Sequence, residues 1–176
     1  MIESAYPGDI IGIHDPGIFN IGDTLSEKKA NLEYTGIPQF APEHFMKVST
    51  KNALKRKQFV KGITQLSEEG AIQVYRQPNG GMEELIVGVV GVLQFEVLEY
   101  RLKQEYGVDV TMYSLPYSHV RWVENDLSKF GKLSMPMDTL LVEDKHRNPA
   151  VLFSNEWSIR TMTERNEGLV LKETSL

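Results

Sequence analysis

Six cationic side chains lie within one fifteen-residue segment that contains no acidic residue. This basic segment runs from Lys47 to Lys61, and its cations are Lys47, Lys51, Lys55, Arg56, Lys57 and Lys61. The whole chain is acidic, with 19 Lys+Arg against 24 Asp+Glu and a net charge of −5, which argues against nucleic-acid binding by the entire surface. A local strip of cations can still neutralise phosphates of folded RNA. The six residues are therefore the candidate RNA contact, and a merely solvated helix surface is the alternative.

The mode of RNA binding follows from what accompanies these cations. No aromatic residues alternate with them, which argues against stacking on single-stranded bases. Recognition of RNA shape and backbone is the mode that fits such a strip.

Nucleotide hydrolysis is the second chemistry to consider. A phosphate-binding loop needs two glycines at a fixed separation, followed by Lys and Ser or Thr. Gly12 and Gly17 have that separation, but Ile18 and Phe19 stand where Lys and Ser/Thr are required. No Asn-Lys-x-Asp motif is present to recognise guanine. We therefore expect this chain neither to bind nor to hydrolyse GTP, and to be no enzyme.

Metal and nucleophile chemistry also lack a pattern. The histidines are scattered, at His14, His44, His119 and His146, with no His-x-x-x-His pair. The chain has no cysteine, so a thiolate zinc site and a disulfide are excluded. Ser49, Ser67 and Ser154 lie in no nucleophile-elbow motif. We expect no metal site and no catalytic residue.

The basic segment spans the end of an expected strand and the start of an expected helix. The strand covers Phe45–Thr50, and the helix covers about 53–68, with Phe59, Val60, Ile63 and Leu66 on one apolar face. On a helical wheel Lys57 and Lys61 point away from that face, and Lys55 flanks it. The cations would thus be offered outward.

A buried strand then runs directly into a second helix. The apolar run 85–90 predicts the strand, and Phe95, Leu98, Leu102 and Tyr106 have helical spacing. We expect Gly88 and Gly91 to supply backbone freedom at the turn between them, and the helix to end at Gly107 before a strand at 108–113. A strand at 71–76, paired across a loop at Asn79-Gly80-Gly81, completes the order β-α-β-β-α-β. This order predicts an α+β, split βαβ (ferredoxin-like) antiparallel sandwich.

The remaining residues predict a weaker α+β half packed on the first. A strand is expected at 119–124, a short helix at 127–133, strands at 140–143 and 150–153, a helix capped by Asn155, and a strand at 169–172. Trp122 alternates with its neighbours in the first of these strands, which favours a core position. Trp157 lies in the first turn of the last helix, and the sequence does not decide whether its side chain is buried or exposed.

Several segments resemble a known family. Gly88–Glu96, followed by Arg101–Lys103 and Tyr106–Val108, resembles the strand-to-helix signature found downstream of the GTPase domain in translation factors of the elongation factor G type. Within that superfamily, four further segments resemble the C-terminal part of the bacterial peptide chain release factor 3 family: Thr35–Pro38, Phe40–Glu43, Gln65–Ala71 and Arg121–Glu124. The resemblance covers essentially the whole chain.

The resemblance also divides the chain. Residues 10–14 and 18–21 read as a hairpin joined at Asp15-Pro16-Gly17, and their sequence resembles the closing strands of the β-barrel domain that follows the G domain in translational GTPases. We therefore expect residues 1–35 to be a remnant of that barrel and 36–176 to be the C-terminal α+β domain, with halves of about 36–116 and 117–176.

The family resemblance implies a role in translation termination. The full-length protein would bind GTP and promote recycling of class I release factors from the ribosome. Its C-terminal region would contact ribosomal RNA and ribosomal proteins, act on class I release factors indirectly, and couple to its own G domain and β-barrel. GTP and magnesium would belong to a G domain that this chain lacks, so no cofactor is expected here.

Location and rival functions complete the sequence interpretation. The longest apolar stretch, residues 85–93, includes two glycines and is far short of the roughly 20 residues that span a bilayer. We expect a cytoplasmic protein without a membrane partner. Two other functions stay open: an independent RNA-binding or regulatory α+β module, since split βαβ folds serve many functions, and a small-molecule-binding or catalytic sandwich.

Overall fold

The computed structural model describes residues 4–16, 18–19, 22–27, 34, 40–78, 84–130 and 133–174. The chain divides into two compact units, Met1–Ile37 and Pro38–Leu176. All helices and strands among the described residues belong to the second unit.

The described residues of the first unit form turns and irregular chain. The carboxylate of Asp15 accepts hydrogen bonds from the backbone N–H groups of Ile18 (3.0 Å) and Phe19 (3.3 Å). The predicted strand at 10–14 is wrong, because no described residue of this unit offers the neighbouring strand that its backbone N–H and C=O groups would need. Its expected partner, 18–21, lies partly outside the described residues. The assignment to a barrel remnant stays a prediction.

The second unit opens with the predicted β-α-β-β-α-β order, which confirms the α+β class. The elements are β1 (His44–Thr50), the 3₁₀ helix η1 (Ala53–Lys55), α1 (Arg56–Glu68), β2 (Gln73–Tyr75), β3 (Glu84–Val89), α2 (Leu93–Tyr106) and β4 (Val110–Leu115). Their strands form a sheet of order β2-β3-β1-β4 with antiparallel neighbours throughout, which is the split βαβ arrangement. The expected loop at 79–81 lies outside the described residues.

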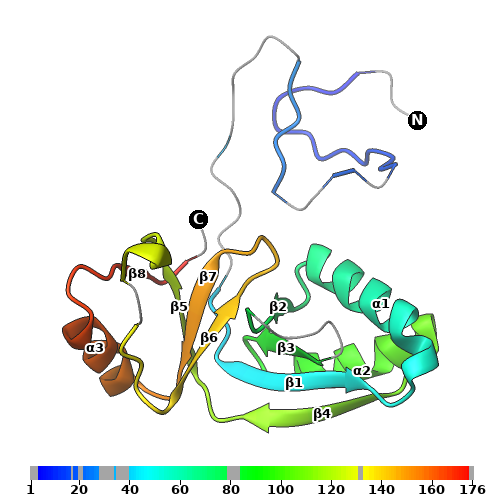
Figure 1. Ribbon diagram of the computed structural model, residues 1–176. Coiled ribbons are helices and arrows are strands. Elements are labelled where there is room, and N and C mark those ends of the chain that lie inside the picture. The colour runs from blue at the N-terminus through cyan, green and yellow to red at the C-terminus, as the bar shows by residue number, and fades with distance from the viewer. Residues whose placement is uncertain are drawn as a thin grey trace. The chain divides into compact units, whose positions relative to one another are not determined.

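Helices α1 and α2 cover one face of this first sheet (Figure 1). Both helices carry apolar side chains at helical spacing, and these are buried together with alternate residues of the strands. The cluster includes Phe59, Ile63, Leu66, Phe95, Leu98, Leu102, Val48, Leu85 and Val87. The predicted core positions on both helices are thus confirmed, with Val60 and Tyr106 partly buried at its margin.

The two glycines near the β3–α2 turn have different roles from those expected. Neither Gly88 nor Gly91 has a positive φ, so the turn does not depend on their backbone freedom. Gly88 lies within β3, where an added Cβ would be 2.8 Å from Pro42 Cγ and 3.0 Å from Phe45 Cε1. Gly88 is therefore required by close packing. Gly107 does end α2 in the left-handed conformation, at φ 64°, as predicted.

The second half repeats the strand order of the first. It contains β5 (His119–Val123), the 3₁₀ helix η2 (Leu127–Phe130), β6 (Thr139–Glu143), β7 (Pro149–Phe153), α3 (Glu156–Arg165) and β8 (Leu171–Lys172). Their sheet has the order β6-β7-β5-β8, so each strand occupies the place of its counterpart in the first sheet. Asn155 caps α3 as predicted, because its Oδ1 accepts from the Ser158 N–H at 3.0 Å. Together with Met162, the second sheet and its flanking loops form a separate small core that includes Val151 and Phe153.

The inner faces of the two sheets pack against each other. Phe45, Tyr75 and Ile86 of the first sheet are buried with Trp122 and Leu152 of the second. This confirms the predicted core position of the tryptophan, whose ring lies 6.4 Å from that of Tyr75. The pKa of the Tyr75 phenol is raised, first by burial and then by the nearby charge of Asp144.

The two sheets also meet at their edges. Arg76, just after β2, and Glu143, at the end of β6, exchange backbone hydrogen bonds of 2.8 and 2.7 Å. Trp122 Nε1 donates to the buried Asp144 Oδ2 at 3.1 Å on the same side of the molecule. The backbone bonds between Arg76 and Glu143 join the second half to the first, whereas the Trp122–Asp144 bond lies within the second half.

Candidate nucleic-acid interface

The structure divides the basic segment between two faces of the first sheet. Lys47 lies in β1, level with Ile86 of β3 and Tyr113 of β4, on the face away from the helices. Lys51 follows β1, and its backbone N–H donates to Asp109 O at 3.0 Å. The remaining four cations lie on η1 and α1: Lys55, Arg56, Lys57 and Lys61. The predicted cluster is therefore assembled at the α1 end, and Lys47 stands apart from it.

Lys55 has a structural role of its own. It is half buried, and its Nζ would be 3.8 Å from a Cβ placed on Gly107, the residue that ends α2. The C-terminus of a helix carries the negative end of its dipole. The Lys55 ammonium is thus stabilised within the protein itself.

Lys51, Lys57 and Lys61 are exposed and form no ion pair with any other described residue. Lys57 and Lys61 lie four residues apart, one turn along the outer side of α1. Their charges are therefore available to an external anion.

The cations at the start of α1 oppose the helix dipole. Asn52 caps η1 through a 2.9 Å bond from the Leu54 N–H, but the first turn of α1 contains no acidic residue. Arg56 and Lys57 occupy the first turn instead, where each cation is unfavourable by about 0.3–1 kcal/mol. An anion bound here would be favoured both by the cations and by the dipole.

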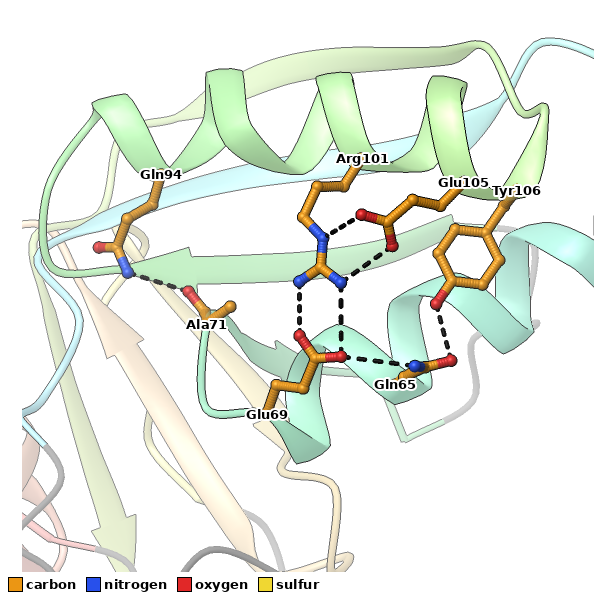
Figure 2. Close-up of polar contacts among 7 residues, drawn as sticks. All are labelled: Gln65, Glu69, Ala71, Gln94, Arg101, Glu105 and Tyr106. Carbon is orange, nitrogen blue, oxygen red and sulfur yellow. Dashed lines mark hydrogen bonds and ion pairs between the residues drawn. The ribbon is translucent and has the colours of Figure 1, made fainter. Parts of the chain in front are cut away.

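A polar network holds α1 against α2 and so fixes the basic surface (Figure 2). Arg101 of α2 donates from Nη1 to Glu69 Oε2 at 2.5 Å and from Nε to Glu105 Oε1 at 2.7 Å. Tyr106 Oη donates to Gln65 Oε1 at 2.8 Å. The Arg101 hydrogen bond lowers the pKa of both Glu69 and Glu105, more than their partial desolvation raises it. We call these five residues the α1–α2 clasp.

Gln94 ties the family-like strand-to-helix segment together. Its Oε1 accepts from the backbone N–H groups of Val90 (3.1 Å) and Gly91 (2.9 Å), and its Nε2 donates to Ala71 O at 2.9 Å (Figure 2). One side chain thus accepts from two backbone N–H groups that precede α2 and also donates to the connection between α1 and β2. In the sequence, only the family resemblance drew attention to Gln94. No residue spacing predicts a hydrogen bond from a side chain to a distant backbone group.

Sequence reasoning missed an apolar stripe on the outer face of α2. Leu93, Val97 and Tyr100 are 67%, 53% and 66% exposed, and the preceding Val90 and Val92 are exposed too. The 3.6-residue pattern had assigned the opposite face of this helix to the core, correctly. A stripe of this kind is suited to contact with protein, since large exposed apolar patches mark interaction sites.

Other candidate chemistry finds no cluster within the described part of the chain. No three His, Cys, Asp or Glu side chains there are placed to hold a metal ion. Trp157, left open by the sequence, is 67% exposed on α3. Among the described helices, none is both long and apolar enough to cross a bilayer.

Comparisons with known proteins identify the family of the chain. The family model for "Class II release factor RF3, C-terminal domain" matches residues 34–163. Peptide chain release factor 3 of Symbiobacterium thermophilum is 45% identical over 175 residues, which are 99% of this chain and 33% of that protein. The proteins of the same name from Microcystis aeruginosa and Trichormus variabilis are each 44% identical, over 97% and 92% of this chain and 31% and 30% of their own length. This chain spans about a third of these curated relatives, and it belongs to the family of the class II release factor RF3 C-terminal domain.

Proposed function

We propose that this chain is the ribosome-contacting region of a translation termination factor, and that its exposed lysines bind backbone phosphates of ribosomal RNA. Family membership supports the termination role. The observation that carries the RNA contact is that Lys51, Lys57 and Lys61 are exposed and form no ion pair with any described residue, beside a first turn of α1 that lacks acidic residues. Such a surface reads charge and backbone shape and needs no base contact.

The wider role rests on the family. A full-length protein of this kind would bind GTP and promote recycling of class I release factors in the cytoplasm. GTP and magnesium would be held by a G domain, and this region would supply docking and coupling to that domain and its β-barrel, with no catalytic step of its own. The apolar stripe on α2 would serve contact with protein, either ribosomal or within the parent chain.

The experiment that tests this proposal is co-sedimentation of the 176-residue chain with purified bacterial ribosomes. We expect Lys57→Glu/Lys61→Glu to weaken binding strongly, because two phosphate contacts become repulsive. Arg160→Glu/Arg165→Glu is the matched control, since both arginines are exposed on α3 and form no ion pair with any described residue. If the α1 variant and the α3 control lost ribosome binding equally, the result would contradict a specific contact by α1. Equal affinity for ribosomes and for an arbitrary RNA duplex would favour a general RNA-binding module instead.

A further inference from the structure

The loop between β6 and β7 presents three consecutive basic residues that the sequence interpretation did not use. The loop consists of residues 144–148, and its tip, Lys145-His146-Arg147, is exposed. Neither Lys145 nor Arg147 forms an ion pair with another described residue. We call these three residues the basic tip. Its charges are unneutralised in an acidic protein.

The basic tip is held rigid from beneath by one buried carboxylate. Asp144 Oδ1 accepts from the backbone N–H groups of His146 (2.8 Å) and Asn148 (2.9 Å), and Oδ2 accepts from Asn148 Nδ2 and Trp122 Nε1, each at 3.1 Å. The loop is thereby anchored to the core between the two sheets. A rigid loop loses little conformational entropy when a ligand binds.

The backbone at Arg147 is in an unusual conformation. Its φ is 66°, which makes it the single non-glycine residue of positive φ in the described ranges. Asn and Gly are the residues that usually occupy this region, because a longer side chain is disfavoured there. A strained residue that the surrounding structure maintains is a reason to look for function. Here the strained position carries the guanidinium.

Two of the carboxylates near the basic tip are bonded to other groups. Arg147 lines a hollow of about 530 Å³ whose wall includes Glu124, Asp126 and Glu143. Glu124 pairs with Lys172 at 2.6 Å, and Asp126 caps η2 through a 3.0 Å bond from the Ser128 N–H. No ion pair joins any of these acids to Arg147. The guanidinium is thus left for an external anion.

Sheet register places the start of this loop near the level of Lys47, the member of the basic segment that lies apart from the cations of α1. Strands β1 and β2 are both antiparallel to β3, so they run parallel to each other, and Lys47 and Tyr75 both lie level with Ile86. They are therefore two strand spacings apart, about 10 Å. Arg76, the residue after Tyr75, pairs with Glu143, which immediately precedes the loop. The tip thus adds exposed cations on the second half to those on the first.

We propose that Lys145, His146 and Arg147 form a second, preorganised contact to RNA backbone phosphates. This inference rests on the proposed function and adds to it that both α+β halves hold the same RNA. Guanidinium can bind phosphate through two parallel hydrogen bonds. The tip presents charge and no apolar side chain, which suits a phosphate ligand. Phosphate requires only fixed charge.

The test compares variants of the 176-residue chain in binding to purified bacterial ribosomes at several KCl concentrations. Lys145→Gln/Arg147→Gly removes two charges, and glycine suits the positive φ, so the fold should be retained and is checked by thermal melting. We expect weaker binding and a log–log salt slope shallower by about 1.4–1.8, since each lost phosphate contact removes about 0.7–0.9. Arg147→Lys should retain the slope while losing part of the affinity. Arg160→Gln/Arg165→Gln, which removes two exposed cations of α3, should leave the ribosome affinity and the salt slope unchanged.

The outcomes separate this inference from the proposed function. If the tip variant binds like the α3 control while Lys57→Gln/Lys61→Gln is weakened, the inference is wrong and the proposed function stands. If neither variant is weakened, both are wrong. If the tip variant loses binding only to phosphatidylglycerol vesicles and not to ribosomes, the ligand is a membrane surface and the inference is overturned.

Discussion

Replacing Gly88 by alanine should destabilise the protein, whereas replacing Gly91, three residues later, should not. A Cβ at Gly88 would lie 2.8 Å from Pro42 Cγ, 3.0 Å from Pro42 Cβ and 3.0 Å from Phe45 Cε1. The proline ring is rigid and Phe45 is buried, so neither neighbour can move aside easily. At Gly91 the nearest atom is Gln94 Oε1 at 4.0 Å, and φ is not positive.

The magnitude follows from comparing the two variants. Both gain the same kind of benefit, about 0.4–1 kcal/mol, because alanine restricts the unfolded chain more than glycine does. Overpacking at a tight core site costs about 1–3 kcal/mol. The difference between the variants therefore isolates the steric cost, and at 2–4 °C per kcal/mol it predicts a gap in Tm of about 2–12 °C.

Urea titration and calorimetry of both variants measure this difference. We expect Gly91→Ala to be as stable as the parent or slightly more so, and Gly88→Ala to be the less stable by the amount above. Equal stability of the two variants, or a larger loss at Gly91, would refute the packing explanation and restore the view that the turn needs glycine freedom.

Three further predictions concern the clasp, the joint between the sheets and the basic helix start. The pKa of both clasp carboxylates is lowered in the folded state, so the stability they contribute is present above the unfolded glutamate pKa of about 4.3 and is lost as pH falls below it. Arg101→Gln should therefore flatten the fall in Tm between neutral and acidic pH. An unchanged profile of Tm against pH would contradict this. Trp122→Phe should lower the unfolding free energy by about 1–3 kcal/mol in urea titration, since Asp144 loses a buried donor, and a neutral effect would count against that bond. Lys57→Glu should raise stability by about 0.3–1 kcal/mol through the helix dipole while weakening ribosome binding; a variant that is both less stable and equally bound would contradict the assignment.

The sequence predicted the elements that depend on local pattern. Helical spacing at Phe95, Leu98 and Leu102 identified α2 and its buried face, and Asn155 marked the start of α3. The succession of strands and helices along the second half also followed from alternation and turn residues, whereas the order of its strands in the sheet was not predicted. What failed was the strand at 10–14, because strand formation depends on a partner that sequence alternation does not reveal.

The candidate site was predicted in part. Composition located the six cations, but only the folded chain shows that Lys55 lies at the end of α2 and that Lys47 faces the other side of the sheet. The role of Gly88 depends on Pro42, a residue far away in sequence. The basic tip went unnoticed because a loop of three basic residues is common, and its importance lies in the hydrogen bonds of Asp144.

The measurement that tests the central claim most directly is the salt dependence of ribosome binding for the chain and for Lys51→Gln/Lys57→Gln/Lys61→Gln. If these lysines contact phosphates, the slope of log Kd against log [KCl] should become shallower by about 2.1–2.7 in the triple variant, at 0.7–0.9 per contact. An unchanged slope, with binding as tight as that of the parent chain, would show that the protein docks by another surface.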